Sequence, residues 1–230
     1  MSLPNKPPCV PRLCYVTDRR SLLRAESAQA SNLLLEKISA ALANGVDWIH
    51  IREKDLSARA CSSLTRDALR GAANSAAKQG GRLRIFVNDR LDVALATQAD
   101  GVHLGEPSLS PREARHLVKT LRRENDFLIG VSCHSLETAK AADESRADYI
   151  FFGPVFATPS KAAYGAPQGL ERLAEVCRAV ALPVLAIGGI TLENAAACLS
   201  AGAAGIAAIR LFQEAPDMAR IVRALRKLSA

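Results

Sequence analysis

The polar loop at residues 158–161 carries the side chains in this chain that are best suited to binding a phosphate. Thr158 and Ser160 offer hydroxyl donors and Lys161 adds a positive charge, which together suit a phosphate group. The loop follows the continuous apolar run 149–152, which is typical of a parallel strand covered on both faces. Short polar loops are also common on protein surfaces, so this loop alone fits an ordinary solvated loop equally well.

Similar residues follow the other apolar runs of the chain. If these runs are parallel strands of one barrel, their carboxyl ends share one face, and the residues after them are neighbours. Cations and glycine amides from several loops then favour an anionic substrate over rim charges that contact only water. His50 lies two residues before Arg52, so the two-residue period of a strand predicts that both face the barrel mouth. The candidate binding residues are Arg52, Lys54, Asn88, Ser132, Thr158, Ser160, Lys161, Gly188, Gly189 and Arg210.

His134 is the strand-end residue with the most versatile chemistry. A histidine titrates near neutrality and can accept and donate a proton, so His134 is a candidate acid–base residue. The competing interpretation is a histidine that only supports the start of the next helix. Gly188 and Gly189 would let phosphate oxygens approach backbone amides, although a helix-entry turn also explains them. His103, within a strand, and His116, on a helix, are expected to be structural.

Strands and helices alternate along the whole chain and would place these residues together. Eight such units in 230 residues predict an α/β fold with a single (β/α)8 TIM barrel over residues 12–230, preceded by a loose lead-in at 1–11. An open doubly wound sheet would show a glycine-rich loop after its first strand, and residues 17–20 (TDRR) are not one. The expected strands are 13–17, 47–51, 83–87, 101–104, 127–132, 149–152, 183–187 and 204–209.

The composition excludes several classes of protein. The chain is 49% hydrophobic, which is enough for a large core and argues against disorder. Its net charge of +7 comes from scattered basic residues, and with three Tyr and one Trp available for stacking we expect no nucleic-acid partner. No apolar run reaches membrane-spanning length, and no CxxC pair indicates a zinc or redox motif. Free thiols and the absence of a targeting signal predict a soluble cytoplasmic protein.

Six motifs in order resemble the family of thiamine phosphate synthase and the TenI-type thiazole tautomerase. They cover nearly the whole chain and imply a compact barrel that handles phosphorylated thiamine precursors, with a possible homo-oligomer. In the synthase, the resemblance implies that the diphosphate and pyrimidine lie among residues 52–161 and the thiazole phosphate lies at Gly188 and Gly189. The motifs are HIREK (50–54), VNDRLD (87–92), ADGVHLG (99–105), GVSCHSLETA (130–139), ADYIFFGPVFATPSK (147–161) and LPVLAIGGIT (182–191).

Three departures separate the two branches of this family. The synthase uses Mg²⁺, which the resemblance assigns to Asp89 and to a second aspartate, but Ser108 stands at that second position and is a poorer ligand for a hard cation. His50 replaces a pyrimidine-contacting Gln and Cys14 replaces an early Tyr. The segment 108–115 and the run around His50 resemble the tautomerase branch, which needs no metal.

The sequence therefore favours a tautomerase of thiazole carboxylate phosphate, in which His134 moves the proton and His50 is the next candidate. The alternative is the Mg²⁺-dependent synthase, in which Asp89 holds the metal. A non-catalytic sensor that binds a phosphorylated pyrimidine or thiazole is the third interpretation. Arg210 departs from both branches and is expected either to add a phosphate contact or to block the site.

Overall fold

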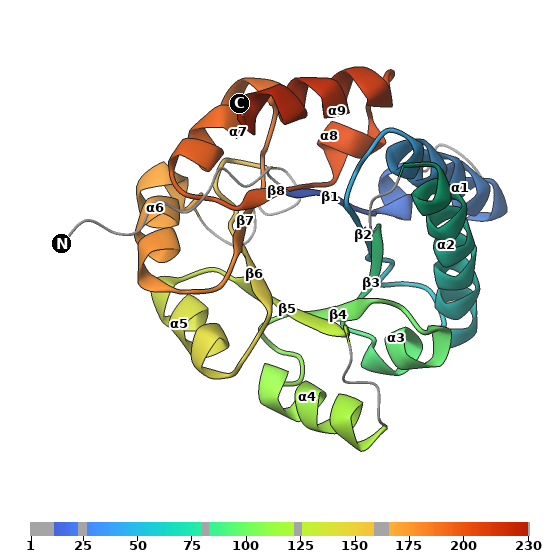
Figure 1. The fold of residues 1–230 in the computed structure, drawn as a ribbon, viewed down its shortest axis with the longest axis horizontal. Helices are drawn as coiled ribbons and strands as arrows, with labels where there is room; N and C mark the ends of the chain where they lie inside the picture. The colour runs from blue at the N-terminus through green and yellow to red at the C-terminus, as the bar shows by residue number, and fades with distance from the viewer. Residues whose placement is uncertain (1–11, 23–26, 80–82, 122–125, 159–165, 230) are drawn as a thin grey trace.

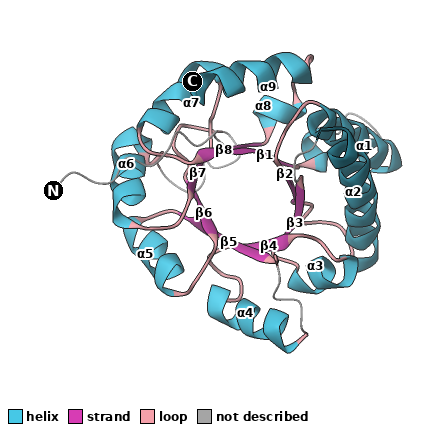
Figure 2. Cartoon of the chain, in the orientation of Figure 1, coloured by secondary structure: helices cyan, strands magenta, loops and turns pink. Residues whose placement is uncertain are grey.

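The computed structural model describes residues 12–22, 27–79, 83–121, 126–158 and 166–229. Its eight described strands form a closed barrel in sequence order, and β1 pairs with β8 to complete the ring. Every neighbouring pair of strands is parallel. Figure 2 shows the strands as an inner ring with the helices around it. The predicted TIM barrel is confirmed, while the predicted lead-in at 1–11 lies outside the described residues.

The strands are short and the helices return the chain along the outside of the barrel (Figure 1). The strands are β1 (Arg12–Val16), β2 (Trp48–Ile51), β3 (Arg84–Asn88), β4 (Gly101–Leu104), β5 (Leu128–Cys133), β6 (Tyr149–Phe152), β7 (Val184–Ile187) and β8 (Gly205–Ala208). The helices are η1 (Arg19–Leu22), α1 (Ser27–Ala43), α2 (Ala58–Gln79), α3 (Leu91–Thr97), α4 (Pro111–Thr120), α5 (Leu136–Glu144), α6 (Gly169–Ala179), α7 (Leu192–Ser200), α8 (Arg210–Gln213), α9 (Met218–Arg226) and η3 (Lys227–Ser229).

Local sequence signals set several helix starts. Ser110 caps α4 by accepting the Glu113 amide, and the Glu113 side chain accepts the Ser110 amide in return, so a full capping box forms. Ser135 caps α5 in the same way through Thr138. Both starts follow from local residue types, since Ser, Thr and Asp satisfy the otherwise unpaired amides of a first turn. After β8 the chain forms two helices, the short α8 and then α9.

The barrel interior is unusually aromatic. Trp48, Phe86, Tyr149 and Phe151 are all buried there, where such barrels more often hold branched aliphatic side chains. Room for the Tyr149 ring comes from Gly130 on the neighbouring strand, because a Cβ at Gly130 would overlap that ring. A second, aliphatic core lies between the strands and the helices. Among the described residues, every helix is too short or too polar to cross a membrane.

Candidate functional site

The carboxyl ends of the eight strands meet at one end of the barrel, here called the mouth. Because the barrel is closed and parallel, residues that follow different strands surround the same opening. Arg52 and Lys54 follow β2, Asn88 ends β3, and Ser132 lies near the end of β5. Gly188 and Gly189 follow β7, and Arg210 begins α8 after β8. The barrel therefore gathers these predicted site residues at one end, as the sequence analysis expected.

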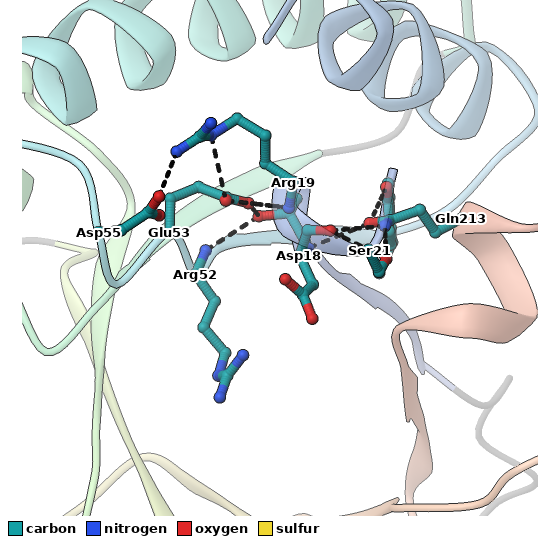
Figure 3. A network of polar contacts seen from close by, with 9 residues as sticks. Asp18, Arg19, Ser21, Arg52, Glu53, Asp55 and Gln213 are labelled. Carbon is teal, nitrogen blue, oxygen red and sulfur yellow. Dashed lines mark hydrogen bonds and ion pairs between the residues drawn. The ribbon is translucent and has the colours of Figure 1, made fainter. Parts of the chain in front are cut away.

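A buried carboxylate organises the mouth beside β1 and β2 (Figure 3). Glu53 accepts a hydrogen bond of 2.5 Å from the Thr17 hydroxyl, and its two carboxylate oxygens share the Arg19 amide hydrogen at N···O distances of 3.0 and 3.1 Å. The Arg19 guanidinium lies 3.8 Å from Glu53 and 2.6 Å from Asp55. Burial raises the pKa of Glu53, and the bonds from Thr17 and Arg19 partly oppose that rise. Glu53 thus connects the β1–η1 loop to the end of β2.

The same network positions Arg52. The Thr17 hydroxyl accepts a 3.0 Å hydrogen bond from the Arg52 amide, while the Arg52 side chain extends away from the network (Figure 3). Gln213 of α8 supports the other side of the loop, since its side chain accepts from the Asp18 amide and the Tyr15 hydroxyl. The backbone of Arg52 is therefore fixed, and its half-buried guanidinium stays available at the mouth.

A cavity of about 240 Å³ opens at the mouth between β2 and β3. Three predicted binding or metal residues, Lys54, Asn88 and Asp89, line it together with the buried Glu53. A lysine, an amide and a carboxylate around one small cavity suit a phosphate-bearing ligand with an associated cation. The complete lining is Ile51, Glu53, Lys54, Leu56, Cys61, Asn88, Asp89 and Arg90.

Asp89 has a backbone conformation that few side chains adopt. Its φ of 60° is in the left-handed region, where a residue other than glycine is uncommon and often marks a functional site. One carboxylate oxygen accepts hydrogen bonds from the Gly105 amide at 2.8 Å and the Ser108 hydroxyl at 2.6 Å. The other accepts from the Asn88 side chain at 2.6 Å. The loops after β3 and β4 thus hold an exposed carboxylate in one orientation.

A chain of hydrogen bonds runs from the mouth into the barrel interior. The Ser132 hydroxyl lies 2.9 Å from Nε2 of His103, and Nδ1 of His103 lies 3.2 Å from the Tyr149 hydroxyl. That hydroxyl is 3.4 Å from Nε2 of His50. A neutral imidazole has one donor and one acceptor nitrogen, so the tautomer of His103 determines whether Ser132 donates or accepts.

The expectation that His50 faces the mouth beside Arg52 is wrong. The His50 side chain is fully buried, with its ring 4.8 Å from that of Phe151 and 4.6 Å from that of Phe86. Strand alternation does place it on the inward face, but the aromatic layer covers it. Burial, and then the nearby His103, hold the pKa of His50 well below its usual value.

His103 was expected to be structural, and it is indeed buried. Burial lowers its pKa to about 3, so the ring is neutral over the whole physiological range. Its contact with Ser132 nevertheless connects it to a predicted binding residue, a role that the sequence analysis missed. The signal that was available is strand alternation, which places His103 on the inward face one strand away from Ser132.

His134 stands between β5 and α5 beside an acidic partner that was not anticipated. Its ring Nδ1 lies 3.6 Å from a carboxylate oxygen of Glu106, and its amide donates to the same oxygen at 3.2 Å. The amide also donates to the Thr138 hydroxyl within the capping box of α5. One-third of the His134 side chain is exposed. The ring is therefore partly accessible at the mouth and lies beside the Glu106 carboxylate.

Gly188 and Gly189 meet a packing requirement as well as any ligand requirement. Their φ values of 96° and 66° are in the left-handed region that favours glycine. A Cβ at Gly188 would lie 2.5 Å from Pro154, and one at Gly189 would lie 2.6 Å from the Ala157 carbonyl oxygen. The loops after β6 and β7 are therefore in direct contact, which brings Thr158 toward the glycine pair. Ser160 and Lys161 lie outside the described residues.

Comparisons with known proteins identify the family of this chain. The model of a protein family described as thiamine monophosphate synthase matches residues 13–212. A Geobacter sulfurreducens protein provisionally named thiamine-phosphate synthase is 46% identical over 195 residues, which cover 85% of this chain and 86% of that protein. A thiamine-phosphate synthase of Roseiflexus sp. is 40% identical over 222 residues, covering 94% and 84%.

One solved structure agrees along nearly the whole chain. It is the thiamine phosphate pyrophosphorylase of Pyrococcus furiosus, which superposes with a TM-score of 0.79 at 32% sequence identity. The match covers 97% of this chain and 98% of that one. Both the fold and the family expected from the sequence motifs are thereby confirmed.

Proposed function

Because the chain belongs to the thiamine monophosphate synthase family, we propose that it joins hydroxymethylpyrimidine diphosphate to thiazole phosphate. The bond from the pyrimidine methylene carbon to the diphosphate breaks, that carbon bonds to the thiazole ring, and diphosphate leaves. The names of the relatives favour this reaction, which the sequence analysis placed second, over the tautomerase that it placed first. Within the proposal, the chain's own residues bind both substrates and stabilise the departing charge.

The diphosphate is assigned to the cavity between β2 and β3. Lys54 and Asn88 line this cavity. The Arg52 backbone between the lining residues Ile51 and Glu53 is held by Thr17, and the Arg52 side chain points away from the Glu53 network. Cations in these positions stabilise the negative charge that grows on the diphosphate as the carbon–oxygen bond breaks. Ser132, whose hydroxyl is oriented by His103, is assigned to the pyrimidine.

The donor groups at Asp89 fit a magnesium ion that arrives with the diphosphate. Mg²⁺ in such enzymes is commonly held by one or two carboxylates plus substrate phosphate oxygens. Asp89 supplies one exposed carboxylate, and the Ser108 hydroxyl lies 2.6 Å from it. Within the described ranges no group of three or more His, Cys, Asp or Glu side chains could hold a metal ion. The described residues therefore provide no metal site made of protein ligands alone. When bound, the ion would neutralise diphosphate charge.

The thiazole phosphate is assigned to the loops after β6 and β7. Gly188 and Gly189 present backbone without Cβ atoms, and Thr158 comes from the loop packed against them. The sequence also offers Ser160 and Lys161, which lie outside the described residues, as ligands for the same phosphate. Arg210, exposed at the start of α8 after the neighbouring strand β8, would add a positive charge beside these loops.

The single observation that carries the proposal is the oriented Asp89 carboxylate beside Lys54 and Asn88 in one cavity. The test supplies the purified protein with both substrates and Mg²⁺ and follows thiamine phosphate and diphosphate by chromatography. We expect both products in equal amounts, and none when Mg²⁺ is replaced by a chelator. Turnover that is unchanged by the chelator, or no product at all, contradicts the proposal.

One contact favours the tautomerase as a second candidate. His134 has a carboxylate partner in Glu106, which is the arrangement that prepares a histidine for proton transfer. The matching test is proton exchange into thiazole carboxylate phosphate in deuterated buffer, with His134→Asn as the comparison. Exchange that depends on His134 supports this candidate. Binding of either substrate without any turnover would instead indicate the sensor interpretation.

A further inference from the structure

A cavity of about 330 Å³ on the outer wall of the barrel is lined almost completely by basic side chains. It lies between α4 and the turn that joins α5 to β6, two elements that stand side by side in the helix ring (Figure 1). None of the assigned substrate residues contributes to it. The lining residues, here called the basic cleft, are Arg112, Arg115, His116, Lys119, Ser145 and Arg146.

The basic cleft is remote from the mouth along the barrel axis. Arg115 donates to the Phe127 carbonyl at 2.9 Å and to the Asp148 carboxylate at 2.5 Å. These two partners immediately precede β5 and β6, so they mark the amino ends of the strands. Because all strands are parallel, the amino ends lie opposite the mouth. A ligand in the basic cleft would therefore be separate from substrates at the mouth.

The spacing of the basic residues on α4 is unfavourable without a ligand. Arg115 and Lys119 are four residues apart on α4, and like charges at this spacing repel one another across a helix turn. Arg112 is also in the first turn of α4, where the helix dipole disfavours a cation. In the part of the chain that the structure describes, Arg115 is the one arginine of the cleft in an ion pair.

Arg146 faces this helix from a constrained turn. Its φ of 61° is in the left-handed region, and its amide donates to the Asp143 carbonyl at 3.0 Å. Arg146 and Lys119 both lie near helix carboxyl ends, where the helix dipole alone would favour them. The dipole does not account for Arg112 at the opposite end of α4. An anion between Arg112 and Arg146 accounts for both.

We propose that the basic cleft binds a small, multiply charged phosphate anion of the size of inorganic diphosphate. Guanidinium groups bind phosphate oxygens through paired hydrogen bonds, and here they approach from two different elements. The described lining contains no Phe, Tyr or Trp side chain on which a nucleobase could stack, which favours a simple phosphate anion over a nucleotide. This proposal stands independently of the reaction at the mouth.

The test compares two double variants that remove the same charge. The cleft variant, Arg112→Ala with Arg146→Ala, removes two exposed arginine side chains of the basic cleft. The α9 variant, Arg220→Ala with Arg223→Ala, removes two exposed arginine side chains of α9. Calorimetric titration with inorganic diphosphate, in a Lys54→Ala background that weakens the mouth, isolates the cleft. We expect about a 100-fold loss of affinity in the cleft variant and little change in the α9 variant, since each guanidinium–phosphate contact is worth roughly tenfold or more.

A second measurement separates binding from damage to the fold. Diphosphate that binds the folded state raises the midpoint of thermal unfolding. In the Lys54→Ala background this rise should persist in the α9 variant and disappear in the cleft variant, while both variants without ligand unfold close to the Lys54→Ala parent. Equal losses of affinity in the two double variants would mean general charge attraction and overturn the proposal. Undiminished binding in the cleft variant would overturn it as well.

Discussion

Glu53 and Asp89 follow the neighbouring strands β2 and β3, line the same cavity and both accept several hydrogen bonds. The donors to Glu53 come from Thr17 and Arg19 in a loop that covers it, and its side chain is only 1% exposed. The donors to Asp89 come from its neighbour Asn88 and the loop after β4, and Asp89 stays exposed. One carboxylate holds the mouth together and the other remains accessible to a ligand.

This difference shows why a carboxylate after a strand is not by itself a catalytic group. Glu53 has a buried cation, Arg19, as its neighbour, so its bonds are already used within the fold. Asp89 is bonded by neutral donors that orient it without neutralising it. A metal or a phosphate-bound cation therefore gains more from Asp89 than from Glu53.

The largest expected effect is on stability at Glu53. Glu53→Ala leaves the Arg19 guanidinium, which is nearly buried, without its closest buried carboxylate. Removing one partner of a buried pair costs about 3–5 kcal/mol, so the unfolding free energy in urea should fall by that amount. The control is Asp67→Ala on α2, which removes the carboxylate partner of the exposed Arg70 and should cost less than about 1 kcal/mol. Equal losses of unfolding free energy in Glu53→Ala and in the control would mean that Glu53 contributes no more to stability than an exposed carboxylate.

The next effect is on activity at Asp89. Asp89→Asn keeps the left-handed backbone, which asparagine tolerates, but removes the charge assigned to the metal. We expect kcat/KM for thiamine phosphate formation to fall about 100-fold, or about 2.7 kcal/mol, with little change in unfolding free energy. Asp92→Asn, an exposed carboxylate on α3 paired with Arg90, is the control and should retain activity. Normal turnover in Asp89→Asn would contradict the assignment of the Asp89 carboxylate to the metal.

A smaller effect concerns pH and the buried histidines. The pKa of His103 is about 3 in the folded protein and near its ordinary 6.5 in the unfolded chain. Between these pH values only the unfolded chain binds a proton at this histidine. Its contribution to the unfolding free energy is therefore fully present above pH 6.5 and is lost as the pH falls toward 3. The lowered pKa of His50 acts in the same direction. Each histidine should contribute a slope of about 1.4 kcal/mol per pH unit.

Unfolding in urea at several pH values measures this slope. His103→Asn should remove the part of this slope that comes from one bound proton, about 1.4 kcal/mol per pH unit. A wild-type stability that is flat between pH 4 and pH 6.5 would contradict the buried, neutral state of both rings.

The smallest expected effect sharpens the role of Asp89 by adding a second carboxylate. Ser108→Asp places an acidic side chain at a position whose hydroxyl already contacts Asp89. If Mg²⁺ binds here with diphosphate, its affinity should rise about tenfold, measured by calorimetry with both present, because carboxylates are better ligands for hard cations. The control is Ser110→Asp, which keeps a good helix cap and lies away from Asp89. Weaker Mg²⁺ uptake in Ser108→Asp would argue against a metal at Asp89.

The sequence by itself determined the barrel, the family and the shared position of Lys54, Asn88 and Asp89 at the strand ends. Strand–helix alternation and capping signals such as Ser110 with Glu113 are local, so they can be interpreted without knowing the fold. Strand ends in a parallel barrel necessarily converge, which is why Lys54, Asn88 and Asp89 were predicted together and do line one cavity.

Only the tertiary structure decided which of these side chains remain accessible. Glu53 accepts hydrogen bonds from residues 36 and 34 positions away in the sequence, and the His50 ring packs against rings from other strands. Neither contact can be inferred from the local sequence. The contact of Glu106 with His134 also spans 28 residues. Burial and hydrogen bonding depend on these long-range contacts, and the same strand-end position can therefore hold the fold together or face a ligand.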